Sequence, residues 1–360
     1  MGPRGLRILI DKDGGNRMTV ETSGGRYLPL RRGRPSGLAP LRGWEDTPAN
    51  RSALFALYRG LILKDGLGVL EPDDEKQLAR GISRQMEMPA ELRTMWGVRE
   101  FMGFKDTAGA GYRFEKWCEG GEMGWLLAND AHLVNWADNP SGFFGFDFTE
   151  LLPKEESLSD DGSCSAAASV IITELRGLMD GRRIWIGCDE CRFYLDVIGD
   201  WIEDMALTGG KMEAAIWLAA QNAGHYLRHS RGRSILAQCP TKISFPDEAA
   251  VDTDLRDGFG YTDAAIRMVK TGMSVKRGGD GRLGARKFLL WRGPHENGVV
   301  DYDLSELVDE LAILSARRTS LNVFERARQD TAGRSHVALY ERFRELRTAP
   351  STPPLLLAAD

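Results

Sequence analysis

The sequence predicts an α/β protein built on a mostly parallel β-sheet that is covered by helices. Short apolar runs, each too brief for a helix, alternate with segments whose apolar residues recur at helical spacing. Two of the runs, residues 7–10 and 184–188, end directly in acidic residues. Buried parallel strands have this continuous apolar character, and in open sheets they bring polar residues to one edge. The same alternation predicts helices over 167–179, 196–207 and 262–271.

Residues 1–45 are predicted to hold the N-terminal strands of the sheet. The run 7–10 is the first strand, and residues 18–21 and 26–30 flank a glycine-containing turn, which predicts a hairpin. Residues 46–150 are then predicted to form a mainly helical insertion. This insertion opens at Thr47-Pro48, an N-cap followed by a first-turn proline, and its aromatic side chains are predicted to be core.

Residues 151–318 are predicted to contain the core of the sheet. Five apolar or β-rich runs are predicted as strands, namely 184–188, 214–220, 241–245, 287–291 and 299–302. A capping box at 303–306 predicts the start of a helix. Residues 319–360 are predicted to hold a C-terminal helix near 320–345 and a disordered, proline-rich tail.

Composition narrows the class of protein without giving a function. The chain has 360 residues, 42% apolar and 28% charged, and a formal net charge of −5, so it is not globally basic. No apolar run has membrane-spanning length, and no secretory leader is visible. The five cysteines are irregularly spaced, as expected for a reducing compartment. These features favour a cytoplasmic protein.

Asp189 and Glu190 form the main chemical motif. An apolar strand that ends in two acids is the Walker B pattern of nucleotide-driven motors. In that chemistry the first acid orders a Mg²⁺ ion through water, and the second orients and deprotonates the water that attacks the γ-phosphate. A strand that simply stops at two solvated acids is the alternative. Gln221 follows the next predicted strand, where such motors place a group that senses the γ-phosphate, although a solvated strand end is again an alternative.

Several segments together resemble a known family, the type IV secretion and conjugative-transfer ATPases of the CagE/TrbE/VirB class. The resemblance extends over about residues 6 to 330, and its strongest segments follow in chain order: Asp11-Lys-Asp-Gly14, Cys188-Asp-Glu-Cys191, Ala219-Ala-Gln221, Thr241-Lys-Ile-Ser-Phe-Pro246, Arg256-Asp-Gly-Phe-Gly260 and Asp309-Glu-Leu-Ala-Ile-Leu-Ser315. It implies a RecA-like domain with a helical insertion, in a hexameric motor that uses ATP and Mg²⁺. It also implies other type IV secretion subunits as partners, a DNA or protein substrate, and a peripheral location at the inner face of the bacterial inner membrane.

The resemblance assigns roles to individual residues. It implies Glu190 as the general base, Gln221 as the sensor and Asp189 as the acid that holds Mg²⁺ through water. It places Asp11, Asp13 and Lys211 among the nucleotide-binding positions. A basic, glycine-rich loop could contact a nucleic-acid backbone, with a solvated loop as the alternative; its candidates are Lys276, Arg277 and Arg282.

Three departures from the family pattern weaken the expectation of activity. The sequence contains no G-x-x-x-x-G-K-[ST] segment, whose backbone amides and lysine hold phosphates, and the family would place it upstream of Arg7. Gly210-Lys211 stands where an arginine-lysine pair is usual, so an arginine finger is lost, and Ala220 replaces the usual threonine. We therefore expect a truncated family member that is inactive alone. A catalytically silent docking subunit of the secretion channel is the alternative.

A zinc site is a rival interpretation of the same region. Cys188, Cys191, His225 and His229 are four zinc-type ligands, but their spacing is unlike that of a zinc finger and Cys188 should lie in a buried strand. A redox role for the two cysteines is also disfavoured, because the pair does not open a helix after a thioredoxin-like strand. We expect ordinary reduced thiols.

Overall fold

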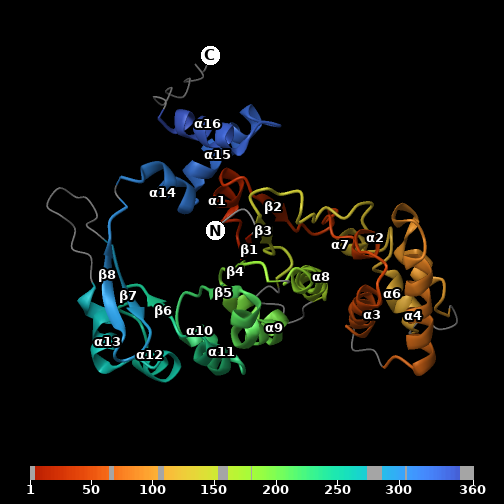
Figure 1. Cartoon of the computed structure of the whole chain (residues 1–360), viewed down its shortest axis with the longest axis horizontal. Helices are drawn as coiled ribbons and strands as arrows, with labels where there is room; N and C mark the ends of the chain where they lie inside the picture. Colours follow the sequence, from red (N-terminus) through yellow and green to blue (C-terminus); the bar gives the residue numbers. More distant parts are fainter. Residues whose placement is uncertain are drawn as a thin grey trace, which may run out of the picture.

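The computed structural model describes residues 5–64, 69–103, 109–152, 161–179, 181–273, 286–304 and 306–348. Its centre is a five-stranded, wholly parallel sheet in the order β2-β3-β1-β4-β5 (Figure 1). The strands are β1 (Leu6–Asp11), β2 (Arg26–Pro29), β3 (Phe143–Asp147), β4 (Ile184–Cys188) and β5 (Ala214–Leu218). The predicted fold class, a mostly parallel sheet covered by helices, is confirmed.

The two faces of the sheet are covered unequally. Ile8 of β1 and Ile186 of β4 point to one face and join the main core, to which α8 (Ser163–Gly177) and α9 (Leu195–Thr208) contribute. Leu9 and Phe143 point to the other face and pack with Val20 in a much smaller cluster. The β4–β5 side of this second face therefore has little cover.

The predicted hairpin near the N-terminus is wrong. Residues 17–22 form the helix α1 (Arg17–Thr22) instead of the first strand of the hairpin, and β2 pairs in parallel with β3. The apolar residues Met18 and Val20 fit either a strand or a short helix, and in α1 both are buried. Gly25 approaches the backbone so closely that a Cβ there would lie 2.7 Å from the Phe143 carbonyl oxygen. The glycines therefore permit close packing after a helix.

A helical segment lies between β2 and β3, but it ends before residue 150. Its helices are α2 (Pro40–Gly43), α3 (Pro48–Leu63), α4 (Pro72–Met86), α5 (Met95–Arg99), α6 (Ala110–Glu115) and α7 (Gly124–Leu127). Thr47 caps α3 as predicted, accepting a hydrogen bond from Asn50 N at 3.1 Å. Phe143–Asp147, predicted as part of the insertion, is instead β3 and is buried along its whole length.

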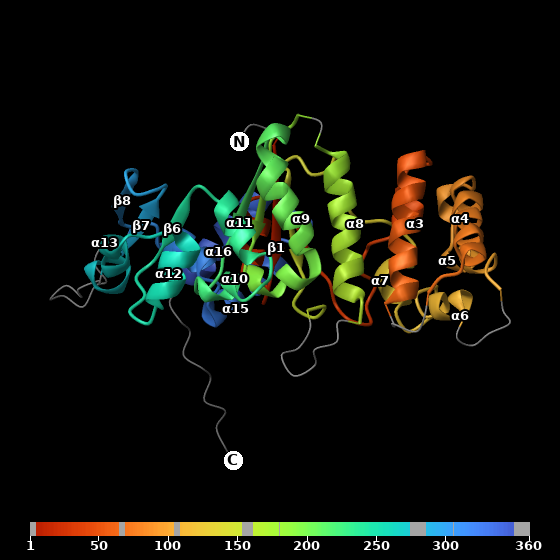
Figure 2. The ribbon, with the colours of Figure 1, turned by 90° about the horizontal axis from the view of Figure 1, so that it is seen from below.

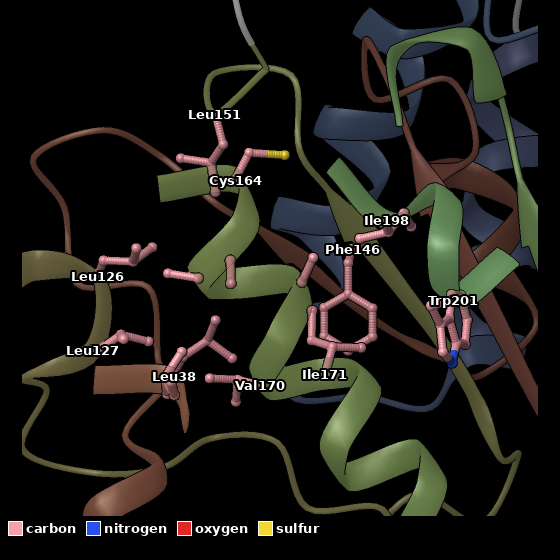
Figure 3. Packing of buried hydrophobic residues seen from close by; sticks show 14 of the residues in the cluster. Leu38, Leu126, Leu127, Phe146, Leu151, Cys164, Val170, Ile171, Ile198 and Trp201 are labelled. Carbon is pink, nitrogen blue, oxygen red and sulfur yellow. The ribbon is translucent and has the colours of Figure 1, made fainter. Parts of the chain in front are cut away.

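Helix α8 separates this helical segment from the sheet (Figures 1 and 2). Figure 3 shows Leu38, Leu126 and Leu127 on one side of α8, and Phe146 of β3 with Ile198 of α9 on the other. One continuous apolar core thus joins the sheet to the segment.

A carboxylate on α8 adds a polar attachment to this contact. Glu174 accepts hydrogen bonds from Trp44 Nε1 at 2.8 Å and Trp136 Nε1 at 2.9 Å, and His132 Nε2 lies 3.0 Å from it. The Nδ1 atom of His132 in turn accepts from the backbone N–H of Ala39. Three side chains from the segment between β2 and β3 therefore converge on one acid of α8.

The later strands do not extend the parallel sheet. The strands β6 (Lys242–Ser244), β7 (Arg286–Trp291) and β8 (Asn297–Tyr302) form a separate antiparallel sheet. The helices α12 (Asp252–Phe259) and α13 (Asp263–Arg267) pack with this sheet. The helices α10 (Gly224–Leu227) and α11 (Gly232–Gln238) contribute to the main core instead. The helix predicted over 262–271 continues past α13 as a π-helical turn, Met268–Gly272.

The C-terminal helices pack on α1. They are α14 (Val308–Leu314), α15 (Arg318–Asp330) and α16 (His336–Thr348), so the single helix predicted near 320–345 is two. The capping box at 303–306 does not start a helix, because α14 begins at Val308. Met18 of α1 is fully buried among the apolar side chains of these helices, and Arg17 forms an ion pair with Glu325 at 2.8 Å. The predicted disordered tail lies outside the described residues.

Across the described ranges, no helix is both long and apolar enough to cross a membrane.

Candidate functional site

Polar side chains gather at the edge of the sheet where the parallel strands end. Asp147 and Asp11 are the last residues of β3 and β1, Asp189 and Glu190 follow β4, and Gln221 follows β5 by three residues. Because these strands are neighbours and run in one direction, their carboxyl ends meet. The sequence predicted the meeting of Asp189, Glu190 and Gln221 at this edge.

Glu190 and Gln221 are in direct contact. Gln221 Nε2 donates a hydrogen bond to Glu190 Oε1 at 3.0 Å. The second oxygen, Oε2, is buried and accepts no hydrogen bond among the described residues, although Arg192 Nε lies 3.9 Å away. A buried carboxylate oxygen without a hydrogen bond is costly unless water or a ligand supplies the donor. The site therefore offers an acceptor for one water molecule.

The backbone of Glu190 is strained. Its φ of 50° and ψ of 47° lie in the left-handed region, which costs a residue with a side chain about 1–2 kcal/mol. Hydrogen bonds on both sides hold this conformation, because Cys191 N donates to Ala219 O at 2.8 Å and Phe193 N donates to Glu190 O at 3.1 Å. The end of β5 thus fixes where the acid stands.

A buried network orients Asp189. Asn16 Nδ2 donates to Asp11 Oδ1 at 2.9 Å and to Asp189 Oδ2 at 3.3 Å. Asp11 also accepts from the Asn16 backbone N–H at 3.0 Å and from Tyr27 OH at 2.6 Å. Burial raises the pKa of both aspartates above the ordinary value. With three donors on its carboxylate, Asp11 holds Asn16 in the position from which Asn16 contacts Asp189.

Asp147 completes the row on the β3 side. It is 3% exposed, accepts a hydrogen bond from Thr149 N at 3.0 Å, and lies 3.6 Å from Arg31 Nη2. Asp147 was not predicted as a site residue, because the run containing it resembles the helical insertion around it. Asn16 and Tyr27 were not predicted either: Asn16 lies next to the acidic turn after β1, whereas Tyr27 is sixteen residues from Asp11 along the chain.

Two of the other predicted site residues, Asp13 and Lys211, lie apart from the contact between Glu190 and Gln221. Asp13, in the turn after β1, is exposed, and its φ of 66° turns the chain away from the strand. Lys211 precedes the amino end of β5, so it lies at the opposite edge of the sheet from Glu190. Within one chain Lys211 therefore does not reach the acid pair, and its role as a nucleotide contact stays a prediction. The basic candidates Lys276, Arg277 and Arg282 lie outside the described residues.

The four potential zinc ligands are engaged elsewhere. Cys188 and Cys191 are fully buried, and burial raises the pKa of both thiols, that of Cys191 to about 12. His229 Nε2 lies 3.0 Å from Asp196 Oδ1, and His225 contacts Asn222. In the part of the chain that the structure describes, no three such side chains form a metal-holding cluster. Since a zinc ligand must be a thiolate, these raised pKa values oppose zinc binding.

We expect elemental analysis of the purified chain to find no stoichiometric zinc, and Cys191→Ser to leave the metal content unchanged. The physical reason is the burial of both thiols in their neutral form. One zinc per chain that disappears in Cys191→Ser would establish the cysteines as ligands.

The parallel sheet, the acids at its strand ends and the covering helices define a RecA-like α/β domain. The structure of VirB4 from Thermoanaerobacter pseudethanolicus shares this fold, with a TM-score of 0.55 over 83% of this chain and 82% of that one, at 14% sequence identity. Curated relatives show the family. The protein virB4 of Agrobacterium fabrum is 37% identical over 329 residues, and the type IV secretion system protein virB4 of Bartonella quintana is 28% identical over 319 residues. The chain belongs to the VirB4 family.

These matches cover 90% and 88% of this chain, but only 39% and 38% of the two relatives. The chain thus spans about two-fifths of the length of the curated relatives it matches. No protein-family model matches the chain.

Proposed function

We propose that this chain is the ATP-hydrolysing motor portion of a type IV secretion or conjugative-transfer system. The observation that carries the proposal is the contact between Glu190 and Gln221 beside Asp189, at the edge where the five parallel strands end. The VirB4 relatives support the assignment to a secretion system. The proposed organisation keeps residues 151–318 as the main part of the RecA-like core, with β1, β2 and β3 contributed by the preceding chain.

In the proposed reaction Glu190 is the general base. Its unbonded oxygen, Oε2, accepts a proton from the attacking water, while Gln221 holds Oε1 and thereby fixes the direction of Oε2. Gln221 is also placed to respond to the γ-phosphate, because any shift of its amide alters the hydrogen bond to Glu190.

Asp189 is proposed to hold Mg²⁺ through water. Carboxylate oxygens suit this ion, and the Asn16 hydrogen bond keeps Asp189 oriented. The ion would supply positive charge to the phosphates when it is bound. Asp11 and Asp13 are proposed to act indirectly at the nucleotide site, Asp11 by anchoring Asn16. A role for Lys211 would require a neighbouring copy of the chain in a ring, such as a hexamer.

The motif that usually holds the phosphates does not occur in the chain. No G-x-x-x-x-G-K-[ST] segment occurs in the 360 residues, and the four acidic groups at the strand ends repel a polyanion. We therefore propose that this chain alone is inactive and that a phosphate-binding loop from elsewhere completes the site.

We expect the purified chain to bind Mg-ATP weakly in calorimetry and to hydrolyse it only at the background rate. Joining a phosphate-binding strand and loop from a longer relative to the chain at Arg7 should confer both binding and turnover. Micromolar ATP affinity of the unmodified chain would show that phosphates are held in another way. A correctly folded graft that binds ATP but never hydrolyses it would contradict the proposed motor function.

A second candidate function is a catalytically silent docking subunit of the secretion channel. The absence of a phosphate-binding motif from this sequence favours it. Under either function we propose other type IV secretion subunits as partners and a peripheral position at the cytoplasmic face of the inner membrane. For the motor alone we propose the transport of DNA or protein. A minor contribution to nucleic-acid binding is then proposed for Lys276, Arg277 and Arg282.

A further inference from the structure

His225 is held in one protonation form by the turn that follows β5. The backbone N–H of His225 donates to Asn222 Oδ1 at 3.1 Å, which fixes the orientation of the Asn222 amide group, because an amide nitrogen in that place could not accept. Asn222 Nδ2 then lies 3.2 Å from His225 Nε2. His225 Nε2 is therefore the acceptor of this hydrogen bond, and the imidazole is neutral with its proton on Nδ1.

The Nδ1–H group of His225 is a second buried polar group without a partner at this end of the sheet. Among the described residues none accepts a hydrogen bond from His225 Nδ1, just as none donates one to Glu190 Oε2. The two side chains share a neighbour, since Arg192 Nε lies 3.9 Å from Glu190 Oε2 and the charge of Arg192 also acts on His225. A buried donor is costly to leave unpaired, so a water or ligand oxygen is expected at His225 Nδ1.

The charges around His225 favour its neutral form. Burial holds the pKa of His225 below its ordinary value of 6.5, and the guanidinium groups of Arg192 and Arg228 act in the same direction. The carboxylate of Glu190 opposes them. On the side of α12, Asp254 lies next to the turn, where a Cβ on Gly224 would be 2.5 Å from Asp254 Oδ2. Because the pKa is lowered, His225 is neutral at neutral pH and becomes protonated only on acidification below pH 6.5.

We propose that neutral His225 is a positioning residue of the hydrolytic site and that it acts on Gln221 through Asn222. Gln221 directly precedes Asn222 in the turn and donates to Glu190 Oε1 at 3.0 Å, so the hydrogen bond between Asn222 and His225 limits the movement of the Gln221 amide. Protonation of His225 Nε2 sets a donor against the Asn222 Nδ2 donor and ends this hydrogen bond. The inference rests on the proposed function, because it takes Glu190 and Gln221 as the hydrolytic pair.

The first test needs no nucleotide and uses the whole chain in an NMR titration. The imidazole nitrogen shifts of His225, assigned by their loss in His225→Gln, should show the Nδ1–H form at neutral pH and a titration midpoint below 6.5. The side-chain amide signal of Gln221 should shift with the same midpoint. In His225→Gln that shift should disappear, because the glutamine amide offers an acceptor oxygen that does not titrate. An Nε2–H form, or a Gln221 signal that does not follow His225, would overturn the proposal.

The second test measures turnover in the chain joined at Arg7 to a phosphate-binding strand and loop. His225→Ala should lower kcat about three- to tenfold, the size of one net hydrogen bond, with KM nearly unchanged. His225→Gln should recover most of kcat and remove the loss of turnover that follows the protonation of His225.

His229→Gln is the matched control. The next histidine along the chain, His229, lies 3.0 Å from Asp196 Oδ1 and not against Asn222, so this variant should keep the kcat and pH profile of its parent. Equal kcat and equal pH profiles in the parent and in His225→Ala would overturn the proposal. If no joined chain hydrolyses ATP, the motor function is wrong, and the Gln221 signal alone decides whether His225 positions that side chain.

Discussion

In the chain joined at Arg7 to a phosphate-binding strand and loop, replacing Glu190 by glutamine should reduce ATP turnover by roughly 10²–10⁴-fold, the usual contribution of a general base. Glutamine keeps the shape of the side chain and can still contact Gln221, but it cannot accept the proton of the attacking water. ATP binding should remain nearly unchanged, because Glu190 acts on water and not on the nucleotide. Steady-state turnover together with calorimetric ATP affinity separates the two effects.

Glu203→Gln is the control for this experiment. Glu203 lies on α9, away from the strand ends, in an exposed ion pair with Arg231 at 2.9 Å. Exposed pairs contribute little, so both turnover and stability should change only slightly. If an active graft hydrolyses ATP equally fast with and without Glu190→Gln, Glu190 is not the general base and the central assignment of the site is wrong.

Glu174→Ala should destabilise the chain by about 3–4 kcal/mol, because it leaves buried donors without their acceptor. The indole N–H groups of Trp44 and Trp136 and the imidazole of His132 all lose one partner at once. The effect should appear as a lower midpoint in urea denaturation, followed by tryptophan fluorescence because two of the donors are indoles. Glu174→Gln, which keeps an acceptor oxygen, should recover part of the loss.

Arg176→Ala is the matched control on the same helix. Arg176 forms an exposed ion pair with Asp204 at 3.6 Å, so its removal should cost less than about 1 kcal/mol. If Glu174→Ala proves as mild as Arg176→Ala, the three donors must find water, and the polar attachment between α8 and the helical segment is unimportant for stability.

The parts of the site that could be predicted from sequence are those with a local signal. The run before Asp189 is short and fully apolar, which favours a buried strand. The two acids at its end indicate both where the strand stops and which chemistry the site can perform. Gln221 could be placed because β5 is also apolar and follows one helix later. In a parallel sheet these two facts suffice to bring the strand ends to one edge.

The errors arose where the pattern is compatible with two structures. Met18 and Val20 are two positions apart, a spacing that places both on one face of a strand but that also occurs in a buried six-residue helix. The glycines after them indicated a turn. The phenylalanine-rich β3 looks like any aromatic core segment, and only its pairing with β1 shows that it is a strand. The pairing of β7 with β6 and β8 is likewise a long-range choice that local periodicity does not record. Asn16 was missed for the same reason, since Asp189 lies 173 residues away along the chain.

The C-terminal helices pack on α1, and through α1 they are connected to Asp189. α1 is six residues long; its Met18 packs among the apolar side chains of these helices, and its Arg17 forms an ion pair with Glu325. The residue immediately before α1 is Asn16, whose side-chain amide donates a hydrogen bond to Asp189. The contacts of Met18 and Arg17 thus connect the C-terminal helices to Asp189 through the one residue that precedes α1. A contact that displaces the C-terminal helices is therefore expected to alter the hydrogen bond between Asn16 and Asp189.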